Sequence, residues 1–253
     1  MNPSIVEDIR ALRESGKKLV LVHGGGDQVT EVAEKLGKKQ QFISSPEGIK
    51  SRYTDKETAE IFTMVMSGLL AKQILQTLEK NGIQSISLTG IDGMLLRAQR
   101  KKKLIIMDER GRKIAIDGGF TGKISEVNTP FLEMLLSNGV IPLVSPVAVG
   151  DEFELLNVDG DRACSHIAGA LKADNAIFLT DREGLILDNM VVENMTTKEA
   201  REALPRIGPG MDKKVIAAVE AVEMGATRSV IGSGLKEHPL QGAQEGRGTV
   251  ITR

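Results

Sequence analysis

The sequence is poor in cysteine and in aromatic residues. It contains one cysteine, Cys164, and no tryptophan, and aromatic residues make up 3% of its 253 residues. A single cysteine excludes an internal disulfide and a cysteine-ligated metal cluster. We expect Cys164 to be a small buried thiol in a helix over residues 161–172. The shortage of aromatic side chains disfavours nucleic-acid binding by base stacking.

Net charge and long apolar runs are scarce as well. The formal net charge is −1, so the chain as a whole has no strong attraction for nucleic acid or membranes. No apolar run approaches the roughly 20 residues of a bilayer-spanning helix, and residues 1–10 lack the layout of a signal peptide. These absences predict a cytoplasmic protein that binds neither nucleic acid nor a membrane.

The chain does contain strand and helix patterns in alternation. Apolar runs that predict buried strands lie at 18–22, 85–88, 140–146, 175–181 and 229–233. Helical patterns lie at 3–16, 29–37, 54–81, 161–172, 197–204 and 212–224. Such alternation predicts an α/β fold, with a mainly parallel open sheet sandwiched between helices, in two lobes that divide near residue 170. Ligands of such sheets bind at the carboxyl ends of the strands.

A glycine-rich turn, "HGGG" at 23–26, connects the first predicted strand to a helix. It matches neither the Rossmann fingerprint nor the Walker A loop. Adjacent glycines at a helix N-terminus can still present several backbone N–H groups to an anion. A tight turn without a ligand is the alternative. Of the three histidines only His23 adjoins a motif, and we expect it to shape this loop.

Five further motifs follow the glycine turn. They are "RYTD" (52–55), "LTGIDG" (88–93), "NVDGD" (157–161), "LTDREGL" (179–185) and "GPGMDKK" (208–214). Together they resemble, in this order, the amino acid kinase family in its acetylglutamate kinase branch. Within that branch "SPEGIKSRYTD" (45–55) is most similar to archaeal members that act on aminoadipate or glutamate attached to an amino-group carrier protein.

The resemblance implies an activity and a division of the chain. It implies one amino acid kinase domain over 1–253, with an acyl-acceptor and dimerisation lobe over 1–170 and an ATP-binding lobe over 171–253. The implied reaction is phosphorylation of a carrier-bound side-chain carboxylate by ATP with Mg²⁺, in lysine or arginine biosynthesis, by a homodimer. A kinase for free N-acetylglutamate is one alternative, and a non-catalytic binding or regulatory relative is another.

The resemblance also assigns the substrate side of the site. Gly25 and Gly26 would offer backbone N–H groups to the substrate. Arg52 would grip a substrate carboxylate with its fork of donors, which lysine cannot copy. Asn157 would hydrogen-bond the substrate. A surface salt bridge is the alternative role for Arg52.

Phosphoryl transfer to a carboxylate brings two anions together, so positioning and charge neutralisation dominate catalysis. By resemblance, Lys214 would neutralise the transferring group and also contact the nucleotide, and Asp161 would orient that lysine. Helix capping is the alternative for Asp161. Residues of the nucleotide lobe would be Thr180, Asp181 and Gly184. No protein metal ligands are expected, and Lys213 is expected to be only a solvated neighbour.

Members of the family begin with a strand that carries Lys-x-Gly-Gly, and residues 1–17 contain no such motif. We expect either a true start further upstream or a truncated, degenerate protein. The sequence as it stands is expected to be a poor catalyst.

Residues 97–113 are strongly basic. They contain eight basic and two acidic residues, a net charge of +6 in a chain of −1, which leaves −7 elsewhere. A solvated face is the simplest interpretation. In the family the corresponding hairpin lies over the acyl-acceptor site, and the carrier protein is acidic. Lys101, Lys102 and Lys103 are therefore expected to contact an acidic carrier.

Overall fold

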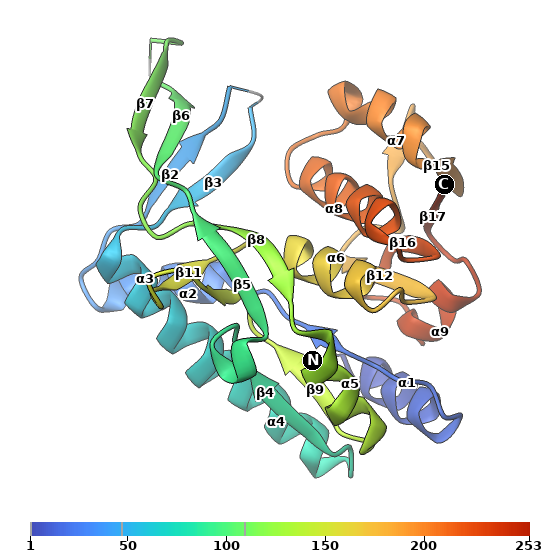
Figure 1. Ribbon diagram of the computed structural model, residues 1–253. Coiled ribbons are helices and arrows are strands. Elements are labelled where there is room, and N and C mark those ends of the chain that lie inside the picture. Colours follow the sequence, from blue (N-terminus) through green and yellow to red (C-terminus); the bar gives the residue numbers. More distant parts are fainter. Residues whose placement is uncertain (1, 47, 109) are drawn as a thin grey trace.

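The computed structural model describes residues 2–46, 48–108 and 110–253, and Figure 1 shows strands and helices distributed over two groups. The helices are α1 (Pro3–Glu14), α2 (Gly26–Lys35), α3 (Lys56–Thr63), α4 (Ala71–Lys80), α5 (Thr129–Ser137), α6 (Gly160–Ala170), α7 (Thr197–Ala203), α8 (Met211–Met224) and α9 (Pro239–Gln244). The fold class expected from the sequence, α/β, is confirmed.

Three sheets form the framework. The first contains, in spatial order, β1 (Leu21–Val22), β9 (Ile141–Val144) and β4 (Ser85–Leu88). The second contains β11 (Leu155–Asn157), β10 (Val147–Val149), β5 (Leu96–Arg100) and β8 (Gly122–Val127). The third contains β12 (Asn175–Thr180), β16 (Arg228–Ser233), β17 (Thr249–Thr252) and β15 (Asn194–Thr196).

Parallel pairing is concentrated where the sequence has continuous apolar runs. β9 pairs in parallel with both β1 and β4, and all its residues are buried, as expected for a strand covered on both faces. β12 and β16 pair in parallel over six positions. Antiparallel pairs join β5 to β8 and β10 to β11. The first strand is shorter than the predicted 18–22, because only Leu21 and Val22 pair with β9.

The hydrophobic cores separate near residue 168. One core gathers buried residues between Leu88 and Ile167, and another gathers residues between Ala168 and Ile251. Helix α1 connects the two groups, because the buried carboxylate of Asp8 accepts hydrogen bonds from His238 Nδ1 (2.9 Å) and Leu240 N (2.7 Å) at the start of α9. The first and last segments of the chain therefore pack together.

The longest helical stretch runs from Lys56 to Lys80 and comprises α3, a π-helical segment and α4. Asp55 caps it by accepting a hydrogen bond from Thr58 N (2.8 Å), as the sequence predicts. This 25-residue helix is long and apolar enough to cross a membrane by length and composition, although it contains no uninterrupted apolar run of about 20 residues. Core helices of soluble proteins meet the same criterion. Ile61 and Phe62 are buried in a core shared with α2.

Two long hairpins rise from the second sheet (Figure 1). They are β2 (Gln41–Ser44) with β3 (Lys50–Tyr53), and β6 (Lys103–Met107) with β7 (Lys113–Asp117). A third, short hairpin pairs β13 (Ile186–Leu187) with β14 (Met190–Val191). The basic segment 97–113, for which the family resemblance implies a hairpin, contains most of β6–β7, whereas no hairpin is predicted for β2–β3, whose strands carry few apolar residues.

Candidate active site

The glycine loop between β1 and α2 has a fixed shape. His23 Nδ1 lies 3.0 Å from the carbonyl of Gly24, so this nitrogen carries the proton and donates it. His23 Nε2 then accepts from the hydroxyl of Ser145 at 2.9 Å. Burial lowers the pKa of His23, although the bond to Gly24 opposes this shift. His23 is therefore neutral at pH 7 and acts as a structural clamp.

The loop leads into a helix N-terminus without a side-chain cap. Gly25 has a φ of 154°, and no side chain among the described residues caps α2. The first N–H groups of α2 are thus available to an external acceptor. Helix α6 begins against the same loop, since a Cβ built on Gly160 would lie 3.5 Å from the carbonyl oxygen of His23. Two helix N-termini therefore converge at this point.

Arg52 reaches this point from β3. Its Nη2 donates to the carbonyl of Gly26 (2.8 Å) and to Thr30 Oγ1 (2.9 Å), and Nη1 donates to Gln40. The guanidinium lies 5.0 Å from the centre of the Phe42 ring. Burial lowers the pKa of Arg52, while nearby Asp27 raises it. All three hydrogen-bond acceptors are neutral, so the guanidinium charge is available to a carboxylate.

Asn157 lies at the end of β11. Its Nδ2 donates to Thr54 Oγ1 at 2.9 Å, and its backbone N–H donates to the carbonyl of Phe120. Thr54 is buried just before α3. The carboxamide is therefore held next to the strand that carries Arg52.

Lys214 and Asp161 form an ion pair across the two groups of elements. Lys214 Nζ in α8 lies 2.8 Å from Oδ1 and 3.1 Å from Oδ2 of Asp161 in α6. The lysine side chain is 16% exposed and the aspartate 30%. Asp159, rather than Asp161, caps α6 by accepting from Arg162 N. Helix capping is thus not the role of Asp161, whose carboxylate is instead paired with the Lys214 ammonium group.

The single cysteine follows Asp161 by one helical turn. Cys164 is partly buried against the core of the second group. Burial, with a contribution from Asp161, raises the pKa of its thiol to about 12, and Lys214 opposes the shift only in part. The thiol is therefore un-ionised and unreactive at neutral pH, which agrees with the expectation from the sequence.

The three residues expected in the nucleotide lobe differ in exposure. Thr180 ends β12, and its hydroxyl donates to Asp181 Oδ1 at 3.1 Å. Phe178, two residues earlier on the same face, has its ring centre 6.0 Å from Lys214 Nζ. Gly184 is buried, and a Cβ there would lie 2.8 Å from Thr249 Oγ1. Thr180 and Asp181 are accessible to a ligand, whereas Gly184 permits close packing.

The sequence model that describes the amino acid kinase family matches residues 3–233. The chain belongs to the amino acid kinase family. It is 49% identical to a LysW-aminoadipate/LysW-glutamate kinase from Sulfolobus acidocaldarius, over 96% of this chain and 93% of that protein. It is 54% identical to a Nitrosopumilus maritimus protein that carries the same name provisionally, over 96% of this chain and 91% of that protein.

Solved structures share the fold of this amino acid kinase. A Streptococcus mutans protein, smu.665, superposes with a TM-score of 0.81 at 24% identity, covering 100% of this chain and 93% of the other. Carbamate kinase from Giardia lamblia superposes with a TM-score of 0.67 at 16% identity, covering 99% and 88%. At these identities the likeness concerns the fold alone.

Lys101, Lys102 and Lys103, the lysines expected to contact a carrier, are all exposed at the base of hairpin β6–β7 in this amino acid kinase. Lys101 N donates to the carbonyl of Thr121, which places Lys101 beside β8. Lys101 is exposed, but partial desolvation by its neighbours lowers its pKa, and the charges of Arg162 and Lys123 lower it further. Lys103 begins β6 and pairs with Asp117 of β7. Lys101 thus belongs to a group of cations that extends toward α6.

Lys213 has a contact that the sequence analysis missed. Its Nζ donates to the backbone carbonyl of Lys50, at the start of β3. The only sequence signal for this residue is its position beside Lys214. A backbone carbonyl leaves no mark in a sequence, so its partner could not have been inferred.

Proposed function

We propose that this amino acid kinase transfers the γ-phosphoryl group of ATP to the side-chain carboxylate of L-2-aminoadipate or L-glutamate bound to an acidic, LysW-like carrier protein. The observation that carries the proposal is the Lys214–Asp161 pair beside two converging helix N-termini. A donor set of this kind suits a transition state whose negative charge is spread over a phosphoryl group. The names of the relatives favour the carrier-bound substrates.

The substrate side is assigned to residues 1–170. The N–H groups of Gly25 and Gly26 hold an oxygen near the reacting carboxylate. Arg52 exchanges its neutral acceptors for a substrate carboxylate, which it can bind through two parallel hydrogen bonds. Asn157 donates a hydrogen bond to the substrate. These contacts fix the nucleophilic oxygen in line with the phosphoryl group.

The nucleotide side is assigned to residues 171–253, with Thr180 and Asp181 at the mouth and Gly184 allowing the strands to approach closely. Lys214 also contacts the nucleotide there, since its ammonium group neutralises charge on the transferring phosphoryl group. Asp161 keeps that ammonium group oriented toward the acceptor side. Lys214 and Asp161 are thus the catalytic residues of the proposal.

Magnesium accompanies ATP in this proposal. No group of three or more histidine, cysteine, aspartate or glutamate side chains that could hold a metal occurs in the described parts of the chain. Mg²⁺ commonly keeps several waters and binds through substrate phosphates with few protein ligands. The residues present therefore suit a metal that arrives with the nucleotide.

The carrier is proposed to dock on the basic segment that contains Lys101, Lys102 and Lys103. All three residues are exposed, and no described carboxylate forms an ion pair with them. Opposite charge raises the rate of encounter more than the final affinity. The docked carrier would present its substrate near Arg52 and Asn157.

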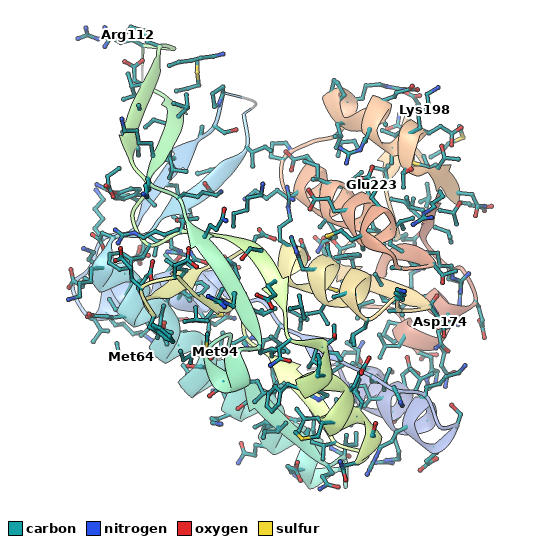
Figure 2. The ribbon with its side chains drawn as sticks, in the orientation of Figure 1. Met64, Met94, Arg112, Asp174, Lys198 and Glu223 are labelled. Carbon is teal, nitrogen blue, oxygen red and sulfur yellow. The ribbon has the colours of Figure 1, made fainter. Side chains whose placement is uncertain are left out.

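A homodimer, a cytoplasmic location and a role in lysine or arginine biosynthesis complete the proposal. Met64 and Leu69 are 56% and 43% exposed on the long helix, and Ile86 is 38% exposed on the edge strand β4. Figure 2 shows Met64 on the outer side of this helix. Exposed apolar side chains such as these suit contact with a second copy.

The proposal is tested by trapping the acyl phosphate with hydroxylamine. The enzyme is incubated with Mg-ATP and one of three acceptors: carrier-bound aminoadipate, carrier-bound glutamate or free N-acetylglutamate. We expect hydroxamate from at least one carrier-bound acceptor at ten times or more the rate of the free one. A faster reaction of free N-acetylglutamate would favour the alternative kinase. No hydroxamate from any acceptor, with retained carrier binding, would indicate a binding or regulatory relative.

A further inference from the structure

Hairpin β2–β3 forms hydrogen bonds with two helices of the candidate site, α2 and α8. On one side Arg52 binds the carbonyl of Gly26 in α2 at 2.8 Å. On the other side the carbonyl of Lys50 accepts a hydrogen bond from Lys213 in α8. Lys50 and Arg52 are two residues apart in β3, so both contacts act on the same short strand.

Lys213 adjoins Lys214 in the first turn of α8. The side chain of Lys214 binds Asp161, whereas that of Lys213 reaches across to the hairpin. One helical turn thus connects the phosphoryl-neutralising group to the strand that carries the carboxylate-binding arginine. An open cavity of about 330 Å³ lies beside this contact, between α8 and hairpin β2–β3. It is lined by Phe42, Lys50, Pro209, Gly210, Asp212 and Lys213.

The turn before α8 and the side chain of Lys50 both leave the Lys213–Lys50 contact unobstructed. Gly210 has a φ of 89°, and its N–H donates to Asp212 Oδ1, so the turn before α8 is held by its own side chain. The ring of Phe42 lies 5.2 Å from Lys50 Nζ and 5.0 Å from the Arg52 guanidinium. The Lys50 ammonium group is therefore directed to the hairpin, and only its carbonyl is available to α8.

We propose that Lys213 is a positioning residue: its bond to the Lys50 carbonyl holds hairpin β2–β3 against α8, so that Arg52 and Lys214 are assembled on the substrates together. This inference rests on the proposed function for its kinetic part. The acceptor is neutral backbone, so any side chain with an N–H donor of similar reach can replace lysine. An isosteric apolar side chain cannot.

The first experiment measures hydrogen exchange in the whole protein, without reference to any substrate. Lys213→Met should speed exchange of the amides in 41–53 by about threefold to tenfold, the range that one hydrogen bond contributes. Exchange in α5 (129–137) should not change. Lys213→Arg should restore the wild-type rate. Lys198→Met, which removes an 85% exposed lysine from α7 (Figure 2), serves as the control.

The second experiment is steady-state kinetics with the acceptor that the hydroxylamine assay identifies. Lys213→Met should lower kcat/KM for the acceptor by about threefold to tenfold and leave the KM for ATP unchanged. Lys50→Ala, which keeps the carbonyl, should cost less than Lys213→Met. A general loss of stability would instead move both KM values and would not be rescued by arginine.

The two experiments separate the possible failures. If 41–53 exchanges at the wild-type rate in Lys213→Met, the positioning role is wrong whatever the substrate is. Failure of Lys213→Arg to restore exchange would also overturn it, since hydrogen-bond donation would then not be the cause. If no acceptor is phosphorylated, the proposed function fails and the exchange experiment alone decides the role of Lys213.

Discussion

Hairpins β2–β3 and β6–β7 rise side by side and share a base, yet they are held in opposite ways. Strands β2 and β6 are in contact, and the N–H of Phe120, just after the second hairpin, donates to the carbonyl of Thr54, just after the first, at 2.7 Å. Above this point β2–β3 is tied to α2 through Arg52 and to α8 through Lys213. Among the described residues, the hydrogen bonds of hairpin β6–β7 stay within the hairpin and its base, and none joins it to a helix.

Apart from its contact with β2, hairpin β6–β7 is held by interactions within itself, so it is called the free hairpin and β2–β3 the anchored hairpin. Asp108 accepts hydrogen bonds from the backbone N–H groups of Arg110 and Arg112 and an ion pair from the Arg112 side chain at 2.8 Å. Figure 2 shows Arg112 at the far end of this hairpin, away from the rest of the molecule. Hairpin β2–β3 therefore holds Arg52 in a fixed position, whereas hairpin β6–β7 exposes its charged side chains to solvent.

The comparison predicts which substitutions affect geometry and which affect encounter. A contact that orients a reacting group should be sensitive to the shape of the side chain. Exposed charges act over distance and are screened by salt within about 8–10 Å.

The largest effect is expected from Arg52→Lys in the anchored hairpin. Lysine keeps the positive charge but loses the planar fork that binds a carboxylate through two hydrogen bonds. We expect kcat/KM for the acceptor to fall about a hundredfold, which corresponds to roughly 2.7 kcal/mol of transition-state stabilisation. Steady-state kinetics provide the measurement. Arg112→Lys at the free hairpin is the matched control and should change kcat/KM less than about twofold. Similar losses in the two variants would remove the distinction between the hairpins.

The sequence predicts the framework better than the anchored hairpin for a physical reason. Buried parallel strands such as β9 need continuous apolar runs, and these are visible without a structure. Strands β2 and β3 are half exposed and are held by contacts with α2 and α8, far away in the chain. Their residues carry no apolar run that would mark them as strands.

In the candidate site, too, some residues are recognisable from the sequence and others only from the structure. Family resemblance located Lys214 and Asp161, and the structure brings them within 2.8 Å of each other. It could not assign Lys213, whose partner is a backbone carbonyl. The charges of Arg162 and Lys123 act on Lys101 through the packing of β8 against α6, which spacing along the chain does not reveal.

An intermediate effect is expected from reversing charge at the base of the free hairpin, with Lys101, Lys102 and Lys103 all changed to Glu. We expect KM for the carrier-bound acceptor to rise about tenfold with little change in kcat, because exposed charge acts mainly on encounter. The wild-type rate at low acceptor concentration should fall as salt rises, and the variant's rate should fall less.

A control with the same change in net charge places the substitutions elsewhere. Lys17→Glu, Lys18→Glu and Lys198→Glu together alter exposed lysines outside the hairpins. Their KM should stay within about twofold of wild type if location matters more than total charge. An equal rise in the control would show that the whole field of the protein, and not this hairpin, attracts the carrier.

The smallest effect is expected from acid, and it concerns one aspartate in each hairpin region. At the tip of the free hairpin, hydrogen bonds from Arg112 and Arg110 lower the pKa of Asp108 below its usual 3.8. Beside the anchored hairpin, burial pushes the pKa of Asp55 up, but Lys38 and Thr58 outweigh burial and the net shift is also downward. A lowered pKa means that the charged form stabilises the fold above pH 3.8 and that this contribution is lost as pH falls through the lower native value.

Activity near pH 7 should therefore be insensitive to both groups. Below pH 3.8 the amides of 110–112 should lose protection, measured against their intrinsic exchange rate at the same pH, and Asp108→Asn should show that loss already at neutral pH. The amides that follow Asp55 should be less affected, since α3 continues into the core. If the amides that follow Asp55 lost protection at a higher pH than those of 110–112, hairpin β2–β3 would be the less stable of the two in acid.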